Sequence, residues 1–194
     1  MLKSSVTLVG IDFSIASPAV TILKDNEYFF YAINRKDSEV VRKMNMLNNV
    51  TVEICLNEGL TPFQYYDKMT DMLIRWINSN IGPNTIFAME DWIYSLRGSA
   101  LIDIVYATSI LRYKLIKKYG EDKLNFYSPT HVKKEFTGNG RADKNMMLDH
   151  FKSLGLVFPL SNYSNALDKT QKPLEDMIDS FAVLKTMENE IENS

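Results

Sequence analysis

The order of strand-like and helix-like segments limits the fold of this 194-residue chain more than any single motif does. Three stretches rich in apolar and aromatic residues, at 5–11, 18–24 and 27–33, follow one another and have the composition of strands. A turn around Asp25 and Asn26 separates the second from the third, which favours a meander. Two later strand-like stretches, "TIFAME" and "KLNFYS", each follow a helical pattern. The sequence therefore predicts an α/β fold with a mixed five-stranded sheet flanked by helices.

Helical patterns fill most of the chain between and after these strands. Thr61 is a typical N-cap, with Pro62 at the first helical position and an apolar stripe that continues to about Asn80. Further helices are expected over 98–119, 129–136, 142–155 and 172–186.

The remaining stretches show no clear periodicity and no domain linker. Residues 34–60 are polar and irregular, so we expect them to form an inserted loop, and residues 188–194 to form a flexible tail. The whole chain, 1–194, is expected to be one domain.

Composition and charge limit the cellular setting and the partners. One cysteine, Cys55, rules out an intramolecular disulfide, and no stretch of about 18 uncharged apolar residues is present to cross a membrane. We therefore expect a cytoplasmic protein, in a bacterial cell or a virus-infected cell. The formal net charge is −2, but the stretch 112–152 holds ten Lys and Arg against five acids, a local excess of +5. A local excess of this kind favours phosphate binding, although a solvated helix face would give the same count.

Two acids stand at the ends of strand-like stretches. Asp12 follows Val6, Leu8 and Gly10 at a period of two, so its side chain is expected on the same face of the strand as these residues. Glu90 ends "IFAME" in the same way. Taken singly, each is explained as well by a solvent-facing strand end or a helix-capping acid, because buried carboxylates are rarely left unpaired.

A second pair of acids lies in the last helical stretch. Asp176 and Asp179 are three residues apart beside an apolar stripe, and like charges at that spacing on a helix repel one another. The helix dipole explains acids in the first turn, such as Glu175 and Asp176, better than it explains Asp179. The stripe consists of Leu174, Met177, Ile178, Phe181 and Ala182.

Considered together, the four carboxylates predict a metal site. A mixed sheet can bring two strand ends and one helix to the same point, where four carboxylates repel unless a cation lies among them. Mg²⁺ prefers such hard oxygen ligands. Two ions about 3.5–4 Å apart can promote hydrolysis of a phosphodiester.

Four motifs in this order resemble the RuvC-type Holliday junction resolvases of the ribonuclease H-like superfamily. They are "GIDFS" on the first strand, "MED" at the end of a later strand, "TGNGRADK", and "EDMIDSFAV" on the last helix. The resemblance covers most of the chain apart from 34–60. It implies that Asp12, Glu90, Asp176 and Asp179 bind two Mg²⁺ ions, for which Mn²⁺ can substitute.

The resemblance also implies residues that contact DNA. Lys144, which follows the glycine-rich stretch, matches a lysine implicated in DNA binding and catalysis. Lys133 falls where the family has another DNA-contacting lysine, and Lys134 matches nearly as well. Arg141 belongs to the same basic group.

An aromatic residue that opens the junction centre in the family has no direct match here. The corresponding position in this chain is Ile93, which is flanked by Trp92 and Tyr94. The two aromatics either contact DNA or pack in a core or dimer interface.

By resemblance, the protein is a crossover junction endodeoxyribonuclease that acts in DNA recombination and repair. A homodimer would nick two strands of a four-way junction symmetrically. The alternatives are a nuclease on other branched DNA or on RNA–DNA hybrids, and a catalytically silent DNA-binding module. Retention of all four carboxylates disfavours the silent module. The dimer face is expected on the helix 98–119, through Leu101, Ile104, Val105, Thr108, Leu111 and Leu115.

Overall fold

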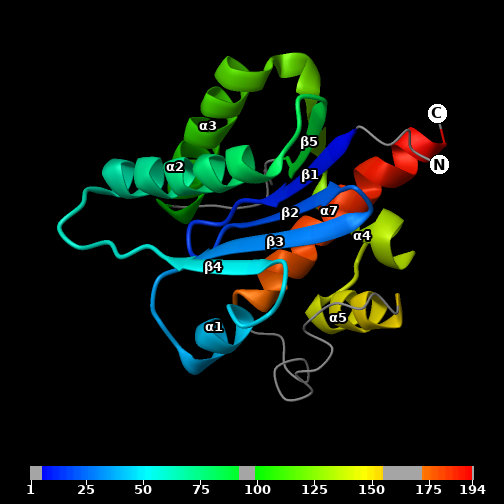
Figure 1. Cartoon of the computed structure of the whole chain (residues 1–194), viewed down its shortest axis with the longest axis horizontal. Coiled ribbons are helices and arrows are strands. Elements are labelled where there is room, and N and C mark those ends of the chain that lie inside the picture. The colour runs from blue at the N-terminus through cyan, green and yellow to red at the C-terminus, as the bar shows by residue number, and fades with distance from the viewer. Residues whose placement is uncertain (1–5, 92–98, 155–171, 194) are drawn as a thin grey trace.

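A six-stranded mixed sheet forms the centre of the molecule (Figure 1). The computed structural model describes residues 6–91, 99–154 and 172–193. The strands are β1 (Thr7–Asp12), β2 (Ala19–Lys24), β3 (Glu27–Asn34), β4 (Val50–Ile54), β5 (Thr85–Glu90) and β6 (Leu124–Tyr127). Their order across the sheet is β4-β3-β2-β1-β5-β6. The first three strands form the predicted antiparallel meander, while β4, β5 and β6 join in parallel.

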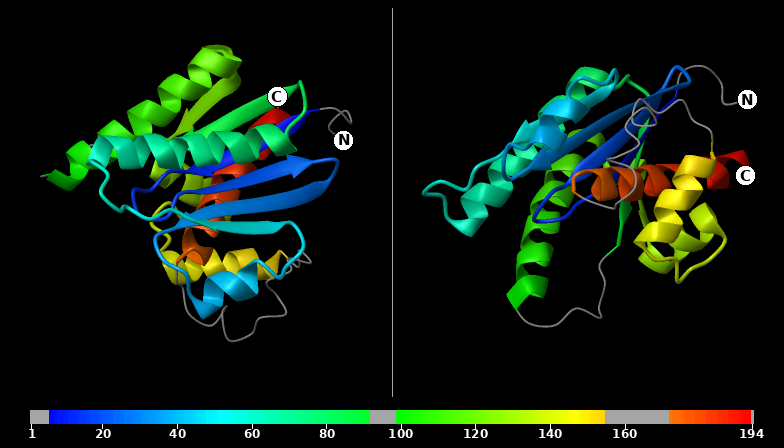
Figure 2. Two further views of the ribbon diagram at one scale, coloured as in Figure 1. Left: turned by 60° about the vertical axis from the view of Figure 1, so that its left-hand side comes forward. Right: turned by 90° about the horizontal axis from the view of Figure 1, so that it is seen from below.

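Helices cover both faces of this sheet (Figure 2). The helices are α1 (Glu39–Met44), α2 (Pro62–Asn80), α3 (Ser99–Tyr119), α4 (Pro129–Thr137), α5 (Lys144–Ser153) and α7 (Leu174–Glu192), with a short 3-10 turn η1 (Glu121–Lys123). Helices α2 and α3 pack on one face, whereas α7 packs on the other and is itself covered by α4 and α5. No helix within the described ranges is long and apolar enough to span a membrane.

Local sequence signals place several helix ends where they were predicted. Thr61 caps α2 and forms a reciprocal capping box with Gln64, while Pro62 occupies the first turn. Ser128 caps α4, ahead of Pro129, and its hydroxyl accepts from the backbone N–H of His131. Each cap satisfies backbone N–H groups that have no partner inside the helix.

The alternation of β1 decides which of its residues face α7. Val9 and Ile11 belong to the core beneath α2 and α3, whereas Leu8 belongs to the core beneath α7. Gly10 lies on the α7 side, because a Cβ added there would collide with the carbonyl oxygen of Ser180 and with Leu184. Asp12 therefore ends the strand on the α7 side as well.

The predicted sheet lacked one strand, and the predicted loop was wrong. Residues 34–60 contain α1 and β4, and β4 pairs with the outer edge of β3. The side-chain amide of Asn45 accepts from the backbone N–H of Val52 at 2.6 Å and donates to its carbonyl at 2.9 Å, which ties the segment to itself. A five-residue strand that depends on an edge partner has little local signal of its own.

The predicted flexible tail also differs from the structure, because α7 continues to Glu192. Met187 is buried and Ile191 packs against the same core. The Tyr127 hydroxyl donates to Glu190 at 2.8 Å, which links the end of α7 to β6. These contacts hold the last turns of the helix against the sheet.

Helix α3 turns a different side to the core than the sequence suggested. Of the six residues predicted for a dimer face, Thr108, Leu111 and Leu115 are buried within this chain, and Leu101, Ile104 and Val105 are partly buried. The exposed apolar side chains of α3 are instead Ile102, Tyr106 and Tyr113. The helix is apolar on more than one side, so its periodicity alone does not identify the inward face.

Candidate metal and nucleic-acid site

The ends of two parallel strands bring Asp12 and Glu90 to the same edge of the sheet. Ile11 on β1 lies opposite Met89 on β5, and each acid follows directly in its strand. The carboxyl ends of neighbouring parallel strands form the usual binding edge of α/β sheets.

Helix α7 adds Asp176 and Asp179 to this edge. The helix packs tightly against β1 at Gly10, and the hydroxyls of Thr21 and Ser180 form a buried hydrogen bond of 2.8 Å between β2 and α7. Asp176 is 5% exposed, and Asp179 is partly buried one turn further on. The packing of the helix therefore directs both aspartates toward the end of β1.

The four acids lie close enough to oppose one another's ionisation. Burial, and then Asp179, Asp176 and Glu90, raise the pKa of Asp12 well above its ordinary value. Burial and then Asp179 raise the pKa of Glu90 to about 7. Burial and then Asp176 raise the pKa of Asp179 to about 6. Repulsion between like charges in a region of low solvent access explains the common direction.

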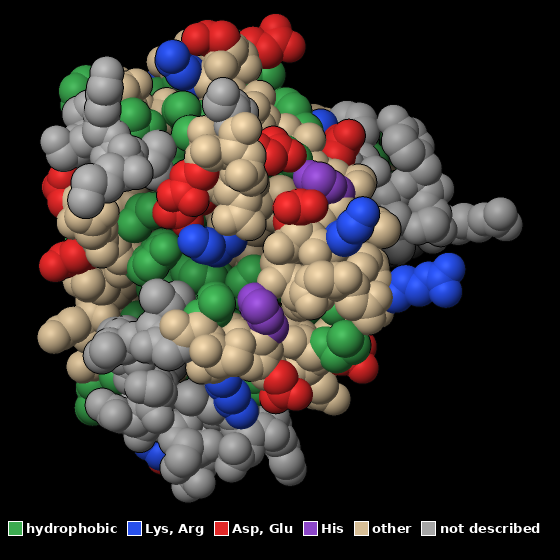
Figure 3. Space-filling model, turned by 90° about the vertical axis from the view of Figure 1, so that its right-hand side faces the viewer, with side chains coloured by type: hydrophobic (Ala, Val, Ile, Leu, Met, Phe, Trp, Pro, Cys, Tyr) green, Lys and Arg blue, Asp and Glu red, His purple; other side chains and the backbone are tan. Residues whose placement is uncertain are grey.

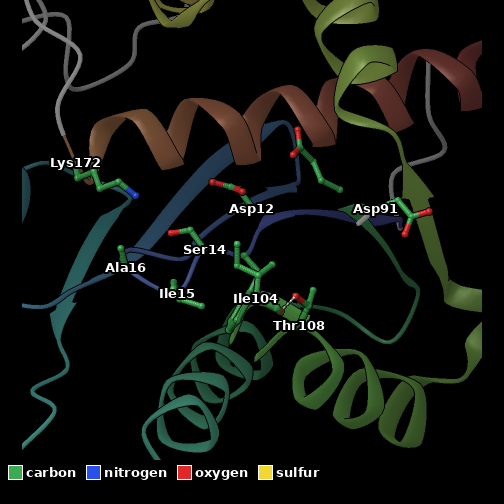
Figure 4. Close-up of a pocket in the computed structure, with 10 residues that line it drawn as sticks. Asp12, Ser14, Ile15, Ala16, Asp91, Ile104, Thr108 and Lys172 are labelled. Atoms are coloured by element: carbon green, nitrogen blue, oxygen red, sulfur yellow. Dashed lines mark hydrogen bonds between the residues drawn. The ribbon is translucent and has the colours of Figure 1, made fainter. Parts of the chain in front are cut away.

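A cavity of about 320 Å³ opens beside these acids. Figure 4 shows Asp12 and Lys172 on its α7 side, with Ile104 and Thr108 of α3 opposite. Its other lining residues are Phe13, Ser14, Ile15, Ala16, Glu90 and Asp91. Two of the four acids, Asp12 and Glu90, thus border a cavity that is lined by polar and apolar side chains together.

Three lysines face the acids from different elements. Lys172, just before α7, donates to Asp176 at 3.0 Å. Lys144, the first residue of α5, forms an ion pair with Glu175, and that hydrogen bond raises the pKa of the Lys144 ammonium. Lys133 on α4 lies close enough to lower the pKa of Glu90 and Asp179 against the effect of burial.

The fold has close counterparts among solved structures. The structure of Thermus thermophilus RuvC superposes with a TM-score of 0.58 at 12% sequence identity, covering 96% of each chain. T. thermophilus RuvC in complex with a Holliday junction substrate superposes with the same TM-score and identity, covering 93% of this chain and 91% of that one. This chain has a RuvC-type fold.

The RuvC-type fold confirms the architecture expected from the sequence resemblance, with six strands in place of five. No protein-family model matches the chain, and no curated protein matches it. At 12% identity the likeness concerns the fold, so the chemistry has to be argued from the residues themselves.

Within this RuvC-type fold, the predicted basic residues separate into two groups. The charges of Lys133 and Lys144 both lower the pKa of Asp179, whereas Lys134 and Arg141, which are exposed as Lys144 is, are not among the charges that shift the four acids. The structure therefore distinguishes Lys133 from Lys134, which the sequence did not. Trp92 and Tyr94 fall outside the described residues.

The surface around α4 and α5 carries both signs of charge. On the face turned to the viewer in Figure 3, described Lys and Arg side chains stand among acids, histidines and polar atoms. The visible basic side chains do not merge into one continuous patch, so any contact with phosphates on this face relies on individual lysines and arginines.

Two neighbours of the acids were not singled out from the sequence. Glu175 is 11% exposed in its side chain and pairs with Lys144. Lys172 pairs with Asp176 at a spacing of four residues, which the sequence could have indicated.

The residues fit a hard divalent cation in their chemistry. All four predicted ligands are carboxylates, and one oxygen of Asp176, Oδ2, is buried without a hydrogen-bond partner among the described residues. A buried, unpartnered carboxylate oxygen is a poor contributor to folding but a suitable cation ligand. The four acids share this edge, but among the described residues no three His, Cys, Asp or Glu side chains already form a metal-binding group.

Proposed function

We propose that this protein is a metal-dependent, structure-selective endonuclease that resolves four-way DNA junctions by paired symmetric nicks. The observation that carries the proposal is the convergence of Asp12, Glu90, Asp176 and Asp179 from β1, β5 and α7 at one edge of a RuvC-type sheet. A protein that only bound DNA would gain nothing from this repulsion.

The four carboxylates would hold two Mg²⁺ ions, with Mn²⁺ as a substitute. Bound ions would supply Lewis-acid stabilisation of the charge that develops on the cleaved phosphodiester. Because the pKa values of all four acids are raised, they lose protons on cation binding, so cation affinity increases with pH.

Lys133 and Lys144 would hold the cleaved phosphate from the α4 and α5 side. The charges of both lysines lower the pKa of Asp179 against the effect of burial, so they border the place where the reacting phosphate would lie. Lys134 and Arg141 are exposed on the same side and would contact phosphates further along the strand.

Branched DNA is the proposed partner, and a homodimer the proposed assembly. T. thermophilus RuvC, which shares the fold, has been solved with a Holliday junction substrate. A two-fold enzyme would match the symmetry of a four-way junction. Light scattering tests the dimer, with an expected mass of twice the 22.3 kDa chain. A mass of one chain, both with and without junction DNA, would contradict it.

One cleavage experiment separates the proposal from its alternatives. Labelled four-way junction, duplex DNA and RNA–DNA hybrid are each incubated with the protein in Mg²⁺, Mn²⁺ or EDTA. We expect cleavage of the junction alone, in paired products, and only with metal. Faster cutting of the hybrid would indicate a ribonuclease H-like activity, and binding without cutting in any metal would indicate a silent binding module.

A further inference from the structure

Lys172 occupies an unusual position for a lysine beside a proposed metal site. It lies two residues before α7, and its Nζ donates to Oδ1 of Asp176 at 3.0 Å. The Lys172 side chain is 42% exposed, whereas that of Asp176 is 7% exposed. The ammonium therefore reaches a buried carboxylate from the solvent side, along the wall of the cavity that holds Asp12 (Figure 4).

The charge of Lys172 acts on more than its ion-pair partner. Of the described residues that line the cavity, Lys172 is the only lysine or arginine, whereas Asp12, Glu90 and Asp91 contribute acids. Its positive charge also favours the ionised form of Asp12. The Lys172 ammonium thus partly neutralises two of the four acids, as a bound cation would.

Asp176 is only half satisfied by this contact. Its Oδ1 accepts from Lys172, whereas Oδ2 is buried outside the distance of a regular hydrogen bond to the described residues, and the Ser17 hydroxyl beside this carboxylate lowers its pKa against the effect of burial. Because the Lys172 side chain is 42% exposed, its ammonium can move into water when another cation takes its place at the buried Asp176 carboxylate. The site therefore keeps one free ligand oxygen and one oxygen held by a displaceable cation.

We propose that Lys172 is a tethered counter-ion that neutralises the carboxylates in the metal-free site and is displaced when a divalent cation binds. This inference rests on the proposed metal site. It assigns Lys172 a role in cation affinity, as a positioning residue for Asp176 and Asp12, and not a part in the chemical step. A positive charge that leaves on metal binding weakens metal affinity, because displacing it has a cost.

The affinity for Mn²⁺ in the absence of DNA tests the proposal directly. Free Mn²⁺ is measured by electron paramagnetic resonance during titration of the wild-type protein, Lys172→Met and Lys172→Arg. Removal of the competing charge should tighten Mn²⁺ binding about tenfold in Lys172→Met. Lys172→Arg keeps the charge and should bind like the wild type.

Lys185→Met is the matched control. Lys185 also pairs with an acid of α7, Glu188, and its side chain is 27% exposed, but neither residue lines the cavity. The control should leave Mn²⁺ affinity unchanged. An equal gain in both variants would mean that overall charge causes the effect and would overturn the specific role of Lys172.

Thermal unfolding provides a second readout that a merely structural ion pair would not produce. In EDTA, Lys172→Met should melt below the wild type, because Asp176 loses its partner. At saturating Mn²⁺ the difference should disappear or reverse, because the variant gains more from the ligand. A loss of the same size in both conditions would overturn the proposal. If Lys172→Met does not fold, Lys172→Gln removes the charge but keeps a hydrogen bond, and carries the same expectations.

The experiment also distinguishes this inference from the proposed function. If the wild type binds no Mn²⁺ at all, both the metal site and the counter-ion role are wrong. If the wild type binds Mn²⁺ and Lys172→Met binds it equally or more weakly, only the role of Lys172 is wrong.

Discussion

The two faces of the sheet are packed in different ways. Under α2 and α3 the contacts are largely apolar and aromatic, with Tyr31 stacked on Trp76 at 4.9 Å between ring centroids. Under α7 the core around Phe181 is also aromatic, but it includes the buried Thr21–Ser180 hydrogen bond. Both buried acids of the described chain, Asp176 and Glu188, belong to α7.

This difference indicates that the two faces of the sheet have different roles. Burial of apolar area under α2 and α3 stabilises the sheet, and the buried acids of the described chain lie on the other face. Packing of α7 contributes to stability as well. At one end of this helix, however, its carboxylates and those at the strand ends repel one another. Four predictions test this comparison, from the largest expected effect to the smallest.

The largest effect is expected from removing charge at the α7 edge. Asp12→Asn, Glu90→Gln and Asp179→Asn should each lower junction cleavage at least about 100-fold, a barrier change near 2.7 kcal/mol. Junction binding, measured by gel shift in Ca²⁺ or EDTA, should remain nearly intact.

Asp71→Asn is the control on the opposite face. Asp71 pairs with Lys114 between α2 and α3 at 2.6 Å and is 67% exposed in its side chain. It should leave the cleavage rate unchanged. If Asp12→Asn, Glu90→Gln or Asp179→Asn kept more than about a tenth of the wild-type rate, its activation barrier would have changed by only about 1.4 kcal/mol, and that residue would not be one of the proposed ligands.

The second prediction concerns pH in the absence of metal. The folded protein holds the pKa of Glu90 at about 7 and that of Asp179 at about 6, above their ordinary values of 4.5 and 3.8. Between each ordinary pKa and the raised pKa of the folded protein, the folded state binds more protons than the unfolded state. The free energy of unfolding therefore falls as pH rises. We expect a loss on the order of a few kcal/mol between about pH 4.5 and 7 in EDTA.

Urea unfolding at a series of pH values measures this loss. Asp179→Asn should flatten the dependence, because it removes one titrating group and its repulsion of Glu90. Asp71→Asn should leave the slope as in the wild type. A wild-type stability that rises with pH over this interval would show that the acids do not repel one another as described.

The third prediction concerns the close approach of α7 to β1. Gly10→Ala places a methyl group against the backbone of Ser180, so α7 must move away from the strand. Overpacking of this kind should reduce the free energy of unfolding by about 1–3 kcal/mol. Cleavage should fall as well, because Asp176 and Asp179 would move relative to Asp12.

Gly82→Ala is the matched control, since the nearest atom to its added methyl group is the Thr7 hydroxyl at 3.5 Å. Its stability should stay within about 0.5 kcal/mol of the wild type. If Gly10→Ala were equally mild, the contact between α7 and β1 would be looser than the structure indicates.

The smallest effect is expected from the adjacent lysines of α4. Lys133→Ala should lower cleavage more than junction binding, because Lys133 faces Glu90 and Asp179. Lys134→Ala should weaken all DNA substrates alike and reduce the slope of log affinity against log salt by about one unit. Filter binding at several salt concentrations and a single-turnover cleavage assay measure both effects. If Lys134→Ala lowered cleavage more than binding and Lys133→Ala weakened all substrates alike, the roles proposed for the two lysines would be exchanged.

The sequence by itself determined the features that depend on near neighbours. The caps at Thr61 and Ser128 are formed by residues within three positions, so they could be predicted locally. The period of two along β1 placed Asp12 on the side of Leu8 and Gly10. The resemblance to the RuvC-type pattern then identified the four acids that the fold brings to one edge.

Only the tertiary structure decided the features that depend on distant partners. Strand β4 exists because the edge of β3 is available to it, and α7 continues to Glu192 because the sheet and Tyr127 hold its end. Helix α3 is apolar on several sides, so only packing against α2 selected Leu111 and Leu115 as its inward residues. Lys133 and Lys134 are adjacent in the sequence, but Lys133 is the one whose charge acts on Glu90 of β5 and Asp179 of α7, and no local pattern encodes that direction.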